Sequence, residues 1–100
     1  MEAYKIVKEY SFSFENLEHP VHVRISKSIN IDNFLVEDDS EDLYILEFSH
    51  FYKPSETAGF YHKSKSGNTI DKLQQEMILY IKGFEYCVDT ELNKHYTLQK

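Results

Sequence analysis

The chain is poor in several residue types that mark particular classes of protein. Its 100 residues include one cysteine, Cys87, and one arginine, Arg24, and no tryptophan. A single cysteine excludes a disulfide within the chain, so we expect a reducing compartment and a cytoplasmic location. With only three glycines and two prolines, the composition argues against a disordered or loop-dominated protein.

Long hydrophobic segments are also missing. No apolar run approaches the roughly 20 residues that a membrane-spanning helix needs, so we expect no membrane partner. Residues 1–5 contain no basic patch followed by an apolar stretch and do not predict a signal peptide. What is present, 41% apolar residues of which many are aromatic, suffices for the core of a single domain covering residues 1–100.

Negative charge is concentrated in one part of the chain. The eleven residues from Glu37 to Glu47 carry six carboxylates and neither lysine nor arginine. Residues 1–36 have a net charge of −1 and residues 48–100 a net charge of +1, so this segment accounts for the −6 of the whole chain. The basic residues are scattered, whereas binding to phosphates requires clustered lysine and arginine. We therefore expect no direct nucleic-acid partner.

Alternation of apolar and polar residues predicts two antiparallel strands in the first third. Residues 4–14 have mostly apolar even positions and mostly polar odd positions, the period of a strand with one buried face. After a turn at residues 16–20 the alternation resumes over residues 21–32, with β-branched side chains on one face. Two such strands joined by a short connection form a hairpin.

The middle of the chain predicts two further strands. Residues 43–53 are apolar on both faces, which is typical of a strand covered on both sides. A turn at residues 54–59 leads to a short returning strand at residues 60–63, in a register that opposes His50 to Lys63. Residues 64–67 are expected to form a loop.

The last third predicts a helix that begins after Asn68 as the N-cap. Its apolar stripe has the spacing of one helix face, and Gly83 is expected near the polar side. The helix either continues to about Tyr96 or is followed by a second short helix capped by Asp89. The stripe consists of Ile70, Leu73, Met77, Tyr80, Ile81, Phe84 and Val88. The order of elements predicts an α+β fold, an antiparallel β-meander of about four strands with a C-terminal α-helix packed on one face.

The acidic segment favours a protein-binding function without catalysis. Clustered carboxylates attract basic surfaces, and nearby aromatic side chains can anchor a partner. By analogy of composition, such a chain would act as an inhibitor, an immunity or antitoxin-like protein, or a phage-encoded blocker. A solvated turn that keeps the protein soluble is the alternative. The expected partner-binding residues are Glu37, Asp38, Asp39, Glu41, Asp42, Tyr44, Phe51 and Tyr61.

Two other functions compete with protein binding. The densest basic cluster runs into the helix N-terminus, where backbone N–H groups and the helix dipole suit a phosphate or nucleotide, although no P-loop spacing is present. A homodimer is the other possibility, because a four-stranded sheet with one helix leaves a face open unless residues 34–36 fold over it. The anion-binding candidates are His62, Lys63, Lys65, Asn68 and Thr69.

No residue set predicts an enzyme, a metal site or a cofactor. The acidic segment lacks the spacing of a calcium-binding loop, and no nucleophile elbow is present. The histidines at positions 19, 22, 50, 62 and 95 are expected to be surface or half-buried residues. Cys87 is expected to be a small core residue whose acidic neighbours raise the pKa of its thiol.

Overall fold

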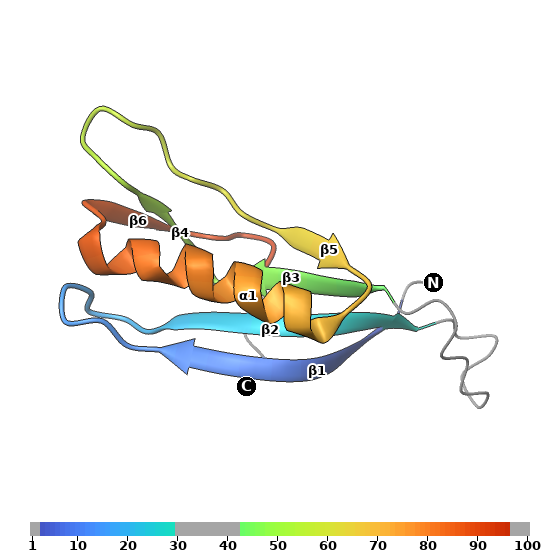
Figure 1. Ribbon diagram of the computed structural model, residues 1–100. Helices are drawn as coiled ribbons and strands as arrows, with labels where there is room; N and C mark the ends of the chain where they lie inside the picture. The colour runs from blue at the N-terminus through green and yellow to red at the C-terminus, as the bar shows by residue number, and fades with distance from the viewer. Residues whose placement is uncertain (1–2, 30–42, 97–100) are drawn as a thin grey trace.

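A computed structural model describes residues 3–29 and 43–96 of the chain, and Figure 1 shows the arrangement of its elements. A four-stranded antiparallel sheet has the order β1-β2-β3-β5, and a smaller antiparallel sheet pairs β4 with β6. Helix α1 packs on the four-stranded sheet, so the predicted α+β class is confirmed. The elements are β1 (Ala3–Phe12), β2 (Val21–Ile29), β3 (Tyr44–Phe48), β4 (His50–Lys53), β5 (Lys65–Gly67), α1 (Ile70–Ile81), the 3₁₀ helix η2 (Lys82–Tyr86) and β6 (Asp89–Leu92).

The predicted hairpin of the first two strands is present but contains a β-bulge. Strand β1 pairs with β2 from Phe12, opposite Val21, to Ala3, and the register shifts between Ile6 and Lys8. Because a bulge inserts one residue, it reverses the faces of the side chains beyond it. The expected single apolar face is therefore wrong for the first residues of β1.

The strand predicted over residues 43–53 is two strands in two different sheets. Ser49 separates β3 from β4 and is fully buried. Its backbone N–H donates to the carbonyl of His22, and its carbonyl accepts from the N–H of Asn93, both at 2.8 Å. The backbone of Ser49 thus joins the beginning of β2 to the end of β6, and the chain changes sheet at this residue.

Pairing also differs from expectation after the turn at residues 54–59. The predicted strand at residues 60–63 reduces to one bridge between Tyr52 and Tyr61, which has the expected register. Strand β4 pairs with β6 instead, and residues 65–67, expected as a loop, form β5 beside β3.

The predicted helix is confirmed, with different ends. Its N-cap is Thr69, not Asn68, and α1 gives way to η2 after Ile81. Residues 89–92 form β6, so the helix does not continue to Tyr96 and Asp89 does not cap a second helix. Val88 is exposed. Gly83 faces the core against Tyr52 and not the polar side. No helix in the described part of the chain is long and apolar enough to cross a membrane.

The core lies between α1, η2 and one face of the four-stranded sheet. The sheet contributes Val21, Val23 and Ile25 from β2 and Leu46 and Phe48 from β3, all fully buried. The helical side contributes the predicted stripe without Val88, in which the buried residues are Leu73, Met77, Tyr80, Ile81 and Phe84.

The opposite face of this sheet is covered in part by the segment after β6. The guanidinium of Arg24 lies 4.2 Å from the ring centre of Tyr96, which is buried. Arg24 also pairs with Glu47 on β3, with Nε and Oε1 3.2 Å apart. Residues 34–36, expected to close this face, lie outside the described residues.

Candidate functional site

The sequence-predicted partner-binding residues separate into three groups. The five carboxylates Glu37, Asp38, Asp39, Glu41 and Asp42 lie outside the described residues. Tyr44 packs against the core on the helix side of β3. Phe51 and Tyr61 belong to the region of β4, which begins beyond Ser49. At about 3.3 Å per residue, Tyr44 and Phe51 are roughly 20 Å apart along the chain.

A different set of side chains lies where the acidic segment joins the sheet. Paired residues of antiparallel strands share a face, so Tyr4 and Ile6 lie with their partners Ser28 and Ser26, on the face away from α1. Ile45 also pairs with Ser26, and the backbone N–H of Ser28 donates to the carbonyl of Leu43 at 3.3 Å. We call Tyr4, Ile6, Leu43 and Ile45 the sheet-end patch.

The sheet-end patch is accessible at its outer row. Tyr4 is 51% exposed and Leu43 is 44% exposed, while Ile6 and Ile45 are half-buried. Leu43 follows Asp42 directly in the sequence. The patch therefore stands at the end of the sheet to which the acidic segment is covalently joined. Sequence periodicity placed Tyr4 on the buried face, and only the bulge after Ile6 turns it outward.

The residues of the anion-binding alternative have acidic neighbours. Nζ of Lys63 lies 3.1 Å from Oε2 of Glu76, and this hydrogen bond, together with the charge of Lys63, lowers the pKa of the Glu76 carboxyl. Nε2 of His62 contacts Oε1 of Glu91. Lys65, Asn68 and Thr69 are exposed around the start of α1. An anion at this place would compete with Glu76 for Lys63 and with Glu91 for His62.

Tyrosines gather where α1 meets β4. The ring of Tyr80 lies 4.8 Å from that of Tyr52 and 5.2 Å from that of Tyr61, and its hydroxyl donates to the carbonyl of Tyr61. Burial raises the pKa of Tyr80, and burial is also the largest cause that raises the pKa of Tyr52. The neutral hydroxyl of Tyr80 fastens residue 61 to the core through this hydrogen bond.

Histidines gather at the junction of the two sheets. The rings of His19 and His50 are stacked, with centroids 4.2 Å apart and planes 12° apart. Nε2 of His19 lies 3.2 Å from Oγ1 of Thr90 on β6, and Nδ1 of His50 lies 2.8 Å from Oγ of Ser49. The backbone N–H of His22 donates to the same serine oxygen. The sequence did not indicate this cluster, because its members come from a turn and three strands.

The histidine cluster is not arranged to hold a metal ion. Imidazole binds a metal in the plane of its ring at about 2.0 to 2.1 Å, and two nearly parallel rings at stacking distance cannot direct their lone pairs to one ion. No group of three or more potential ligands that could hold a metal occurs among residues 3–29 and 43–96.

Cys87 is a half-buried thiol that packs against the core and donates to the carbonyl of Phe84 at 3.3 Å. Burial raises the pKa of this thiol, and the charge of Asp89 adds to the effect. We expect iodoacetamide at pH 7.5 to alkylate Cys87 several-fold more slowly than it alkylates glutathione, because the thiolate is the reactive form. Mass spectrometry of timed samples measures both rates, and an equal or faster reaction of Cys87 would contradict the inert role.

No family model, curated protein sequence or solved structure matches the chain.

Proposed function

We propose that this chain is a protein-binding module that docks on a basic surface of another protein. The docking residues would be the carboxylates Glu37, Asp38, Asp39, Glu41 and Asp42 together with the sheet-end patch. The observation that carries this proposal is that Leu43 and Tyr4 are exposed at the end of the sheet that the acidic segment adjoins in sequence. An inhibitor or antitoxin-like role in a reducing cytoplasm suits such a module.

Charge and apolar surface have separate roles in this proposal. A concentrated negative charge raises the rate of encounter with a positive surface, and salt weakens it because the Debye length is only about 8 Å at physiological ionic strength. The apolar side chains of the patch then slow dissociation, because they are buried against the partner and removed from water. Glu47 does not count among the docking carboxylates, because it pairs with Arg24 within the sheet.

Phe51 and Tyr61 remain candidates for a second contact area. Tyr61 is 47% exposed, and Phe51 lies edge-on to His62 with ring centroids 4.6 Å apart. Their distance from the start of β3 means that a partner would have to be large to reach both areas. The basic loop has no comparable support for a phosphate site, since Lys63 and His62 contact carboxylates of the chain itself.

Affinity capture from a lysate of the source cells tests the proposal with matched baits. One bait is the wild type, and a second carries Glu37→Gln, Asp38→Asn, Asp39→Asn, Glu41→Gln and Asp42→Asn. A third makes the same change in net charge at exposed sites elsewhere, with Glu15→Gln, Glu18→Gln, Glu56→Gln, Asp71→Asn and Glu85→Gln. We expect one partner that the second bait loses and the third bait keeps.

Binding of that partner is then measured with purified proteins. We expect the association rate to fall about tenfold as salt rises from low to physiological concentration, since steering is screened. Leu43→Ser should raise the dissociation constant about tenfold without changing this salt dependence. Equal capture by all three baits, or an association rate insensitive to salt, would contradict docking through the acidic segment. Light scattering separates the homodimer alternative, which predicts a dimer of the purified chain.

A further inference from the structure

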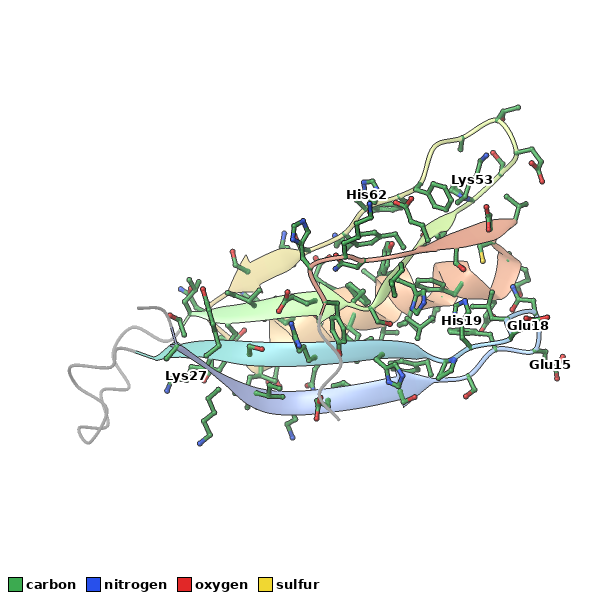
Figure 2. All side chains as sticks on the ribbon, turned by 180° about the vertical axis from the view of Figure 1, so that it is seen from behind. Glu15, Glu18, His19, Lys27, Lys53 and His62 are labelled. Carbon is green, nitrogen blue, oxygen red and sulfur yellow. The ribbon has the colours of Figure 1, made fainter. Side chains whose placement is uncertain are left out.

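The stacked histidines connect the turn between β1 and β2 to the smaller sheet. His50 is the first residue of β4, immediately after the break at Ser49, and His19 belongs to the turn between β1 and β2. Figure 2 shows His19 at this turn, on the side where β4 and β6 lie. Through His50 and Thr90, His19 contacts both strands of the smaller sheet.

The hydrogen bonds of the stack can form with both rings neutral. Oγ of Ser49 already accepts from the N–H of His22, and its hydroxyl proton can be donated to Nδ1 of His50 only while that nitrogen carries no proton. Nδ1 of His19 is buried without a hydrogen-bond partner among the described residues. A proton added there would create a buried N–H group without an acceptor. The free-energy cost of such an unpaired donor is larger than that of a buried ring nitrogen whose lone pair has no partner.

We propose that the His19–His50 stack is a proton-sensitive latch that holds the β4–β6 sheet against the β1–β2 turn while both rings are neutral and releases it on protonation. A charge on either ring would lie about 4 Å from the other ring, and two charges at that distance repel strongly in a partly buried site.

Among residues 3–29 and 43–96, no carboxylate is placed to compensate a charge on His50. On β6 its direct partner is Leu92, while Glu91 pairs with Phe51 on the other face of the small sheet and contacts His62. Asp89 pairs with Lys53 and accepts from the backbone N–H of Thr90. The turn contributes Glu15 and Glu18, which are exposed and lie at its tip in Figure 2. Among the described residues, the groups whose proximity disfavours a proton on His50 are His19 and His22.

The electrostatics of His50 agree with this geometry. Burial, followed by the proximity of His19 and His22, lowers the pKa of His50 from 6.5 to about 4. An opened small sheet would expose the ring and restore the ordinary pKa, so the open form binds more protons below about pH 6.5. Latching is therefore fully effective at neutral pH and weakens as the pH falls from 6.5 toward 4. With an allowance for solvent screening at this partly exposed ring, we expect opening to increase about tenfold between pH 7 and pH 5.

Amide hydrogen exchange followed by NMR tests the latch on the intact chain. The N–H groups of Val88 and Asn93 donate to Lys53 and Ser49 across the β4–β6 sheet and serve as reporters. We expect their protection factors to fall about tenfold from pH 7 to pH 5, while those of the β2–β3 amides change much less. In His50→Phe, which keeps an aromatic ring but cannot be protonated at this position, the reporters should show a much smaller fall.

His62→Gln is the matched control, because His62 contacts β6 from the opposite face of the small sheet. It should retain the loss of protection, because His62 contacts Glu91 and Phe51 on the other face of the small sheet. The ring of His50 in the wild type is titrated in parallel, so the test does not depend on the variant folding. An ordinary pKa for His50, an equal loss of protection in all strands, or an unchanged pH dependence in His50→Phe would each overturn the latch.

Discussion

Replacing Phe84 with alanine is expected to lower the free energy of unfolding by about 3 to 5 kcal/mol. Phe84 is fully buried in η2, and its ring lies 5.0 Å from that of Tyr52, 5.6 Å from that of Tyr80 and 5.7 Å from that of Phe14. Truncation would leave a cavity among three large rings that cannot all collapse into it. A domain of this size has a total stability of about 5 to 15 kcal/mol, so the loss is a large part of it.

Urea denaturation monitored by circular dichroism measures this change, and Tyr86→Ala provides the control. Tyr86 lies in the same 3₁₀ helix but is 83% exposed. Its truncation tests whether η2 itself is sensitive to substitution, and we expect a change within about 0.5 kcal/mol. Similar effects of the two substitutions would mean that Phe84 does not connect the helix to the tyrosine cluster as described.

The parts of the fold that follow from local sequence pattern were predictable. Alternation in residues 21–29 depends only on which side chains face the core, and Val21, Val23 and Ile25 are indeed fully buried. The same applies to α1, where Leu73 and Met77 lie on the buried side of a regular helix. In these elements the period of the apolar residues alone decides the face.

The parts that depend on pairing between distant segments were not predictable. Residues 89–92 have no apolar alternation and continue the phase of a helix stripe, yet they form β6 because β4 offers them an unpaired edge. The break at Ser49 depends on hydrogen bonds to His22 and Asn93. In a strand, such tertiary context outweighs the intrinsic preference of the residues.

The candidate sites likewise combine features that the sequence pattern predicts with features that depend on the pairing of distant segments. The acidic segment is visible in the sequence as composition, but the side chains beside it are not, because the bulge after Ile6 decides that Tyr4 points outward. The histidine stack could not be predicted either, since His19 and His50 meet only when β4 leaves the main sheet. The residue types show where the negative charge lies in the sequence, whereas the pairing of the strands decides which side chains lie together in space.

The proposed docking surface and the proposed latch lie at opposite ends of β2. His22 is near the beginning of this strand and Ser28 near its end, about 20 Å apart at the usual rise per residue. Physiological salt screens charges over about 8 Å, so a charge at one of these two sites has little effect at the other. We therefore infer that opening of the β4–β6 sheet leaves the sheet-end patch in place, and that the two proposals can fail independently.

Gly83→Ala is expected to be the most damaging small substitution, with a loss of about 2 to 3 kcal/mol in the free energy of unfolding. A methyl group at this position would overlap the end of the Tyr52 ring, and even Cε1, the third-nearest atom, would be only 2.7 Å away. Tyr52 is buried and cannot move aside easily, because the rings of Tyr80 and Phe84 lie against it. The backbone at Gly83 has no positive φ, so the effect would arise from this overlap and not from backbone strain.

Thermal unfolding of two further variants separates overlap from a general intolerance of glycine substitution. Gly59→Ala is the control, since a methyl group there would meet no atom within 4 Å, and we expect little change or a slight gain in stability. Tyr52→Leu shortens the side chain that the new methyl group would strike. If overlap is the cause, the double variant with Gly83→Ala should be more stable than the sum of the two single losses implies, because the two sites are in contact. Strict additivity would show that Gly83 is required for a reason other than its approach to Tyr52.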